Sequence, residues 1–218
     1  MSVNALKFLA ALTLGGVTLL QPALAAPDAG AVSKAVADFE RGRQGDADAV
    51  DRAAAEFRDL SSGNPANPLL LAYYGSSVTL QAKYAWAPWN KMKYAERGLG
   101  TLDKALAMVQ PDDDRQIVAD MPVGLGTQLL AVSTFLQVPD MFHRFESGKD
   151  ELRQAMANPA FASAPPRLRA QFLMQAAVVA QKENRREEET ARLKQVVDLA
   201  PGTPVAQRAA GRLKELSQ

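Results

Sequence analysis

From Ala29 onward, apolar residues recur at intervals of three and four positions, and short turns containing Gly, Pro, Asn and Asp separate the periodic segments. This spacing places one apolar stripe along an α-helix, whereas a half-buried β-strand alternates with a period of two. No stretch alternates apolar and polar residues over strand length while being rich in Val, Ile or Thr. The sequence therefore predicts an all-α fold made of antiparallel helical hairpins.

The periodicity also predicts where most of the helices begin and end. Their expected ranges are 29–43, 46–61, 68–86, 88–109, 166–183, 186–200 and 204–216. They form a weak pair over 29–62, an extended pair over 68–110, and a clear pair plus capping helix over 166–216. Residues 112–160 are predicted to be helical without further detail. Pro88 and the pair Thr203-Pro204 are typical of helix starts.

The tail of the chain carries a recognisable spacing of helical positions. Large and small apolar residues and one proline follow in register, namely Leu173, Ala176, Ala177, Ala180, Leu193, Val196 and Pro201. In this spacing the tail resembles the tetratricopeptide repeat (TPR), a helix-turn-helix unit of about 34 residues. Ala180 stands where that family has an aromatic residue, and Glu189 stands where it has a small one.

Residues 68–110 resemble a stretched version of the same unit, because both helices are longer than in the standard repeat. The resemblance implies a short TPR-like α-solenoid of stacked hairpins over residues 26–218. Solenoids of this kind leave an extended concave surface, so the resemblance also implies that the protein binds a protein or peptide there.

The first 25 residues have the pattern of a signal peptide: a short basic start, an apolar run over 8–20, and small residues at Ala23 and Ala25. We expect cleavage after Ala25, because Pro27 disfavours cleavage one bond later. The apolar run is shorter than the ~20 residues that span a bilayer. The mature chain is therefore expected in the periplasm, or secreted from a Gram-positive cell, without a membrane span.

Charge and composition argue against several functional classes. The net charge of +1 gives no reason to expect a nucleic-acid partner, since phosphate binding requires clustered cations. The absence of cysteine excludes disulfides, thiol catalysis and cysteine-based zinc sites. With His143 as the single histidine, a nitrogen-rich metal site is excluded and a catalytic triad would depend on this residue alone. We expect no catalytic residues, no metal and no cofactor.

Two acidic runs have structural interpretations. Carboxylates at the N-terminus of a helix interact favourably with the helix dipole. We interpret Asp112, Asp113 and Asp114 as helix-capping residues on this basis. The run Glu187, Glu188 and Glu189 is interpreted as the solvated face of a helix start. The aspartate run lacks the alternating oxygen ligands of a calcium loop.

The tyrosines and tryptophans of the chain all lie between residues 73 and 94. Helical spacing assigns Tyr74 and Trp89 to buried stripes, and it assigns Tyr73 and Tyr94 to other faces. Tyr and Trp are enriched where interfaces form, and four cations surround this segment. The candidate partner-binding residues are Tyr73, Tyr84, Trp86, Asn90, Lys93, Tyr94 and Arg97. The alternative is that a longer hairpin simply needs larger core residues.

The sequence thus favours an exported, non-enzymatic interaction scaffold that binds a protein or peptide of the cell envelope. An open groove edged by Tyr84 and Tyr94 would support it. The alternative is a small-molecule or lipid-binding accessory of an envelope transporter, in which the apolar segment 122–137 lines a cavity. A pocket beside Leu129, Val132 and Phe135 would support that alternative, although a buried central helix is the simpler interpretation of the segment.

Overall fold

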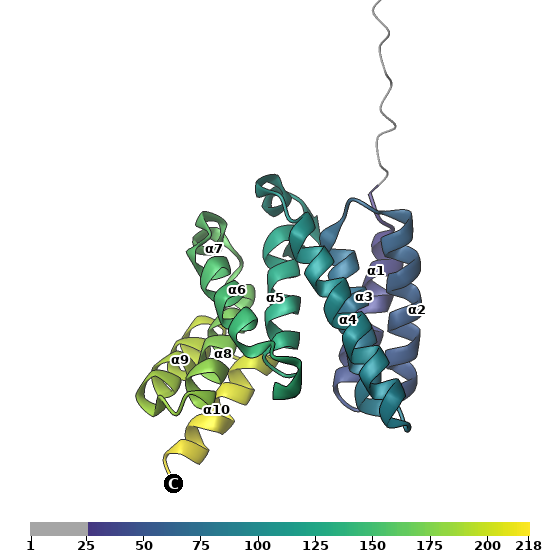
Figure 1. The fold of residues 1–218 in the computed structure, drawn as a ribbon. Helices are drawn as coiled ribbons and strands as arrows, with labels where there is room; N and C mark the ends of the chain where they lie inside the picture. Colours follow the sequence, from purple (N-terminus) through teal and green to yellow (C-terminus); the bar gives the residue numbers. More distant parts are fainter. Residues whose placement is uncertain (1–25) are drawn as a thin grey trace, which may run out of the picture.

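The computed structural model describes residues 26–218, and the expected signal peptide lies outside the described residues (Figure 1). The helices are α1 Ala29–Arg43, α2 Ala47–Gly63, α3 Pro68–Tyr84, α4 Pro88–Met108, α5 Val123–Phe135, α6 Phe145–Ala157, α7 Pro159–Ser163, α8 Pro166–Lys182, α9 Arg186–Leu199 and α10 Pro204–Leu216. Two 3₁₀ helices, η1 Pro111–Arg115 and η2 Asp140–Phe142, flank α5. A small antiparallel hairpin joins β1 Ile117–Val118 to β2 Met121–Pro122.

The helix boundaries agree with those predicted to within two residues, because local capping groups set them. Asp28 and Asp46 accept hydrogen bonds from the backbone N–H groups of Ala31 and Ala49, at 2.6 and 3.0 Å. Asn67 caps α3, and the Thr203 hydroxyl caps α10. Proline opens α3, α4, α8 and α10, where its missing N–H costs no intrahelical hydrogen bond.

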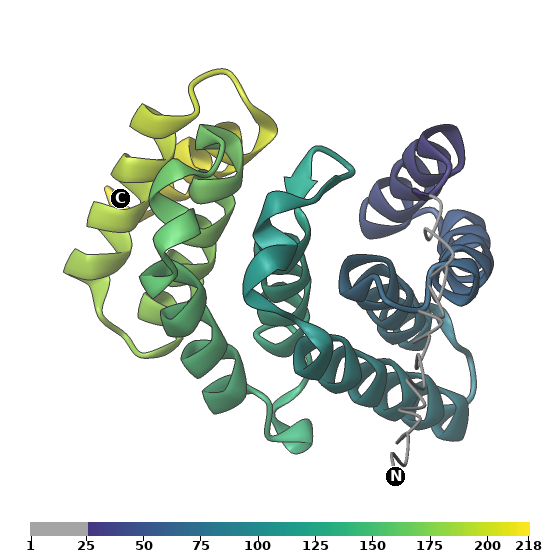
Figure 2. The ribbon, with the colours of Figure 1, turned by 90° about the horizontal axis from the view of Figure 1, so that it is seen from above.

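The helices pack in series along the chain. Each of the first four lies against the next, α5 packs on α3, and the contacts continue from α5 through α6 and α8 to α9 and α10. Seen from above, this array bends into an arc (Figure 2). The prediction of an all-α fold made of stacked helical pairs is confirmed.

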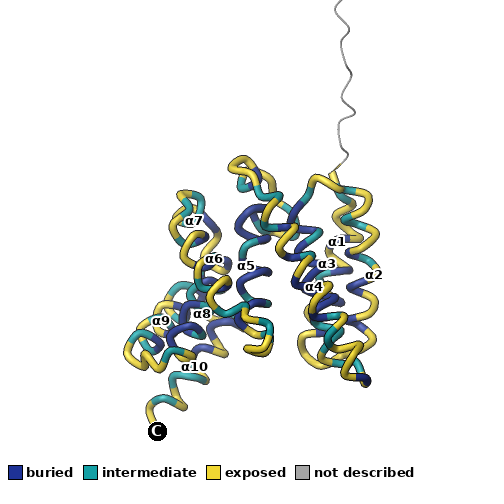
Figure 3. Tube along the Cα trace, in the orientation of Figure 1, coloured by how far each residue is buried: buried dark blue, intermediate teal, exposed yellow. Residues whose placement is uncertain are grey.

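Three apolar cores follow one another along the array. The first lies among α1 to α5, the second joins α5 to α6 and α8, and the third lies among α8, α9 and α10. Because α5 contributes to two cores and α8 to two, each core is coupled to the next. Figure 3 shows the buried positions on the inner sides of the helices along the whole array.

The middle of the chain is organised around α5, which is buried on nearly every side. It packs against α3, α6 and α8, so its sequence is apolar all round rather than striped. Its first turn is capped from a distance: Asp114 Oδ1 accepts a hydrogen bond from Leu125 N at 2.8 Å, and Asn158 Nδ2 donates to Oδ2 at 2.8 Å. Asp113 caps its own helix, η1, by accepting from Gln110 N at 2.7 Å.

An ionic cluster joins α1 to α2 around Asp38, whose side chain is buried. Arg41 and Arg52 both donate hydrogen bonds to this carboxylate, the latter at 3.1 Å, and Lys34 Nζ lies 3.5 Å away. Burial raises the pKa of Asp38, but the hydrogen bonds from the two arginines outweigh it, so the net pKa lies below its ordinary value.

Two aromatic positions on α3 differ from the prediction. Tyr73, expected on the surface, is only 4% exposed; its ring stacks on Phe57 at 4.5 Å and meets the edge of Phe39 at 5.5 Å. Tyr74, expected in the core, is half-buried beside Arg97. The burial of Tyr73 has a clear cause: α3 is covered by α2 and α1 as well as by α4 and α5, so more than one of its faces is buried.

Trp89 was expected in the buried stripe of α4, yet it is 70% exposed. The buried residues of α4 begin at Ala95, so the first seven residues of this helix, 88–94, include no buried side chain. Glu189 also differs, because it is buried rather than solvated. Arg212 Nε of α10 donates to its Oε1 at 2.7 Å, which joins α9 to α10 and raises the pKa of Arg212.

Candidate binding groove

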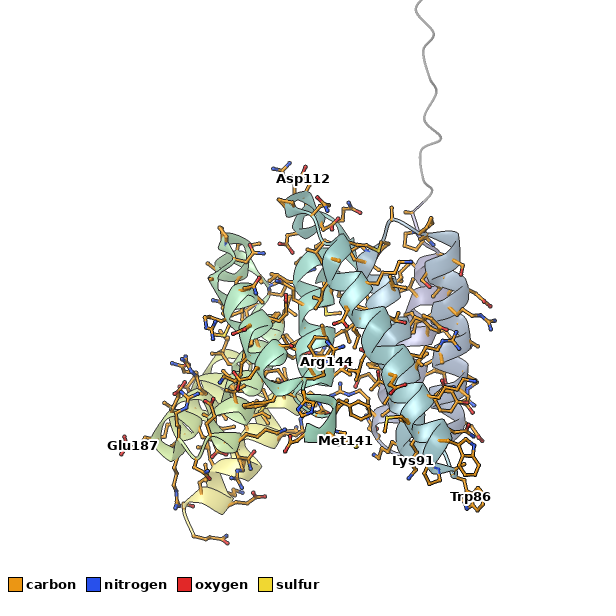
Figure 4. The ribbon with its side chains drawn as sticks, in the orientation of Figure 1. Trp86, Lys91, Asp112, Met141, Arg144 and Glu187 are labelled. Atoms are coloured by element: carbon orange, nitrogen blue, oxygen red, sulfur yellow. The ribbon has the colours of Figure 1, made fainter. Side chains whose placement is uncertain are left out.

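An open groove of about 620 Å³ lies between the lower half of α4 and the segment that runs from the end of α5 through η2. Residues of α3 and the end of α1 complete its lining. Its apolar surface comes from Phe39, Leu80, Met92, Val138, Met141 and Phe142. We call this feature the central groove. Lys91 and Met141 lie on its two sides at the lower end (Figure 4).

The groove exists because α4 and α5 diverge while α3 contacts both of them. The upper ends of α4 and α5 lie close together, and their lower ends separate (Figure 1). Gly75 and Gly98 allow α3 and α4 to approach closely: a Cβ atom on Gly98 would lie 2.6 Å from Gly75 O. On the other side, the Ser76 and Thr134 hydroxyls form a hydrogen bond of 3.0 Å that links α3 to α5.

The hydroxyl groups lining the groove are mostly engaged within their own helices. Thr79 Oγ1 donates to Gly75 O at 3.0 Å, and Ser133 and Thr134 donate to Leu130 O at 3.1 and 2.8 Å. Hydroxyls bonded in this way present their apolar side to the surroundings. The groove therefore offers a ligand an apolar surface with few free hydrogen-bonding groups in its interior.

The charged residues of the groove are all basic: Arg43, Lys83 and Lys91, with no Asp or Glu in its lining. Arg43 pairs with Glu40 at 3.1 Å, and Lys83 Nζ lies over the Tyr84 ring at 5.4 Å. Within residues 26–218, no carboxylate lies within salt-bridge distance of Lys83 or Lys91. The sequence explains this imbalance, because positions 60–95 contain no acidic residue.

A bidentate ion pair fixes the α6 side of the groove to α4. Arg144 Nη1 and Nη2 lie 2.8 and 2.6 Å from the two carboxylate oxygens of Asp103. The same guanidinium lies over the Phe135 ring at 5.1 Å. Arg144 comes two residues after Phe142 of the groove lining, and Figure 4 shows it between α4 and α5. A planar, partly buried contact of this kind restrains both the position and the angle of the start of α6 relative to α4.

The structure separates the seven residues predicted to bind a partner. Tyr73 belongs to the first core, and none of the seven lines the central groove. Tyr84 is half-buried and donates from its hydroxyl to Gly42 O at 2.8 Å, so it faces α1. Tyr94 is half-buried as well, while Trp86, Asn90, Lys93 and Arg97 are exposed. Arg97 donates to the Tyr74 hydroxyl.

Sequence reasoning missed the side of the groove formed by Val138, Met141 and Phe142. The available signal was an apolar run that continues past the end of the predicted central helix. Leu129, Val132 and Phe135, the expected cavity residues, are instead buried between helices and line no groove; their neighbours Ser133 and Thr134 line it. Of the four cations expected around the aromatic segment, Lys83, Lys91, Lys93 and Arg97, the structure places Lys83 and Lys91 in the lining of the central groove.

The single histidine of the chain lies at the surface of the described structure. His143 is exposed at the end of η2, where its backbone adopts the left-handed conformation with φ 53°. Residues 26–218 contain no group of three or more His, Cys, Asp or Glu side chains placed to hold a metal ion. In the same range, no helix combines the length and the apolar character that crossing a bilayer requires.

A second hollow, of about 980 Å³, lies between the start of α1 and the β1–β2 hairpin. Its lining has one charged side chain, Asp120, and it reaches Ala26 and Pro27, the first described residues. The central groove is therefore the better-defined candidate, with a complete lining and a distinct chemical character.

Comparison with protein-family models, with curated proteins and with solved structures finds no match to this chain.

Proposed function

We propose that this protein is an exported, non-enzymatic interaction protein that binds a partner protein through an acidic, amphipathic segment seated in the central groove. The observation that carries the proposal is the combination of an open apolar groove with a purely basic set of charged lining residues. The resemblance of the tail to the TPR supports the same function, since stacked helical hairpins commonly bind peptides on an exposed inner surface.

The chemistry of the groove specifies the partner segment. Apolar side chains of the segment would cover Leu80, Met92 and Val138, and each Å² of apolar surface removed from water contributes about 25 cal/mol. Carboxylates on the other side of the segment would meet Lys83 and Lys91. Such charge pairs contribute mainly to specificity and to the rate of association.

The location in the cell envelope is supported by the sequence pattern of residues 1–25. Fractionation of cells that express the whole chain tests it, together with mass determination of the mature N-terminus. We expect export and an N-terminus at Ala26. Retention of the intact chain in the cytoplasm would refute this part of the proposal.

Charge reversal in the groove tests the binding function. Fluorescence anisotropy measures the binding of labelled acidic amphipathic peptides to residues 26–218. We expect some peptides of the panel to bind, and their affinity should fall as the salt concentration rises. The double variant Lys83→Glu/Lys91→Glu should lose at least about tenfold in affinity, because two attractions become repulsions. Lys194→Glu/Lys214→Glu, which changes two exposed lysines of α9 and α10, is the matched control. Equal loss in both variants would refute binding in the groove.

A second candidate is a carrier of small amphipathic anions, and one observation favours it. The groove volume of about 620 Å³ lies within the roughly 300–1,000 Å³ typical of small-molecule sites. Displacement of an environment-sensitive dye by dodecanoate distinguishes the two functions. Dodecanoate that binds with one-to-one stoichiometry, with no binding from the acidic peptides, would replace the scaffold by the carrier.

A further inference from the structure

The two tryptophans of the chain are its most exposed large apolar side chains in the described range. Trp86 is 92% exposed and Trp89 is 70% exposed. Within residues 26–218 every Phe and Tyr is buried or half-buried. A scattered exposed apolar residue is ordinary, but two neighbouring tryptophans left in solvent indicate a surface that another phase or molecule covers.

The tryptophans lie at the turn between α3 and α4, and Trp86 projects from the lower end of this hairpin (Figure 4). The turn itself is well anchored. Ala87 is buried, Ala85 N donates to Gln81 O at 3.0 Å, and the Tyr84 hydroxyl bonds to the end of α1. The tryptophans are therefore held outward by a defined turn.

Positive charge surrounds these two side chains. Lys83 lies in the last turn of α3, while Lys91 and Lys93 lie in the first turns of α4. No residue from 60 to 95 is acidic, and within residues 26–218 no carboxylate pairs with these three lysines. We call Lys83, Trp86, Trp89, Lys91 and Lys93 the tryptophan tip.

Of the acidic residues near the α1–α2 turn, Glu40 and Asp46 have basic partners, while Asp51 accepts a hydrogen bond from Gln81 Nε2 at 2.6 Å. Glu40 pairs with Arg43 at 3.1 Å, and Asp46 lies 3.7 Å from Arg52. The first carboxylate along α4 is Glu96, five residues after Lys91 and three after Lys93. The tip thus keeps its net positive charge.

We propose that the tryptophan tip docks on an anionic lipid bilayer. Tryptophan rings are enriched at the level of the lipid headgroups, where an apolar ring and a polar N–H are both accommodated. Lysines beside them are attracted to anionic headgroups over about one Debye length. The convex shape favours a bilayer over a protein partner, because a soft surface admits projecting rings whereas a protein would need a matching pocket.

The tryptophan tip shares Lys83 and Lys91 with the lining of the central groove, but its other members lie outside that lining. Trp86, Trp89 and Lys93 are not part of the groove lining, so they can be changed without altering it. Docking through the tip would place the lower opening of the groove next to the membrane, since Lys91 and Met141 lie at the same end of the array (Figure 4).

Intrinsic fluorescence tests the proposal directly, because Trp86 and Trp89 are the only tryptophans in the chain. Residues 26–218, which contain all three cores, are mixed with vesicles of equal parts phosphatidylglycerol and phosphatidylcholine. We expect the emission to shift to the blue and to become protected from acrylamide quenching. Phosphatidylcholine alone, or 1 M salt with its Debye length of about 3 Å, should abolish most of the shift. An unchanged spectrum with the anionic vesicles would overturn the proposal.

Sedimentation with the same vesicles compares matched variants. Trp86→Ala/Trp89→Ala should reduce the partition coefficient about tenfold or more, and Lys93→Gln about fivefold. Ile117→Ala, which removes an apolar side chain of 61% exposure in β1, beyond the other end of α4, should leave it unchanged. The tryptophan variant should still bind acidic peptides in the groove. Membrane docking would be refuted if the tryptophan variant bound the vesicles as strongly as Ile117→Ala does, or if it lost binding of the acidic peptides instead.

Discussion

The close approach of α3 and α4 yields the sharpest test of this structure, the substitution Gly98→Ala. A Cβ atom at position 98 would lie 2.1 Å from Thr79 Oγ1 and 2.6 Å from both Thr79 N and Gly75 O. The threonine side chain can rotate, but the two backbone atoms move only if the helices separate. Ordinary contact begins near 3.4 Å, so α3 and α4 must part by about 0.8 Å.

The expected cost follows from two opposing effects. Overpacking in a well-packed interface costs about 1–3 kcal/mol, and here Leu99 and Leu102 lose packing at the same time. Replacing Gly by Ala within a helix restores about 0.5–1 kcal/mol through the backbone entropy of the unfolded chain. We therefore expect Gly98→Ala to lower the free energy of unfolding by about 1–2 kcal/mol.

The same helix contains the matched control. Gly100 is exposed and has no atom within 4 Å of an added Cβ, so Gly100→Ala should stabilise the protein by about 0.5–1 kcal/mol. Urea denaturation followed by circular dichroism measures both variants. If the two substitutions change the stability by the same amount and in the same direction, the helix contact described here is wrong.

Three further predictions concern buried polar and aromatic groups. Asp38→Asn should destabilise the protein by about 1–3 kcal/mol at pH 7. Because the folded pKa of Asp38 is lowered, the stability that its carboxylate contributes is present above an unfolded pKa of about 3.9 and is lost as pH falls through the folded value. Urea titrations at pH 7 and pH 3 should therefore show a smaller difference in stability between the variant and the unchanged protein at pH 3. Glu189→Gln should lower the melting temperature, since it leaves a charged arginine partner poorly matched, whereas the exposed Glu187→Gln should not. Tyr73→Ala should lower the free energy of unfolding by about 3–5 kcal/mol, while Trp89→Ala should change it by less than about 0.5 kcal/mol, as measured by thermal or urea unfolding. A larger loss for Trp89→Ala than for Tyr73→Ala would instead support the assignment from helical spacing, which placed Trp89 in the core and Tyr73 on another face.

Helix boundaries could be predicted from the sequence because the groups that set them are local. Asp28, Asp46 and Asn67 accept hydrogen bonds from residues two or three positions away, and proline restricts the residues immediately next to it. The direction of each helix face could not be predicted equally well. A stripe of apolar residues identifies the buried face only when a helix has neighbours on one side, as in α10.

Tyr73 and Trp89 show why the candidate site was harder to predict than the fold. Spacing alone assigns a residue to a face, but it does not say how many faces are covered or where a partner helix ends. α3 is covered on several faces, which buries Tyr73, whereas the first seven residues of α4 include no buried side chain, and Trp89 is among them. The lining of the central groove draws on residues from Phe39 to Phe142, so it depends on the angle between α4 and α5, which no local pattern encodes.

The length of the α3–α4 hairpin links the groove to the tryptophan tip. α3 has 17 residues and α4 has 21, and their closest contact, at Gly75 and Gly98, lies well above the turn. Below that contact α4 serves as one side of the groove, and beyond the groove its first turn carries the exposed tryptophan. A wider helix spacing in Gly98→Ala should therefore alter peptide binding in the groove, because Met92 and Ala95 line it. Vesicle binding should persist in the same variant, because the solvent exposure of the tip residues does not depend on the spacing between α3 and α4.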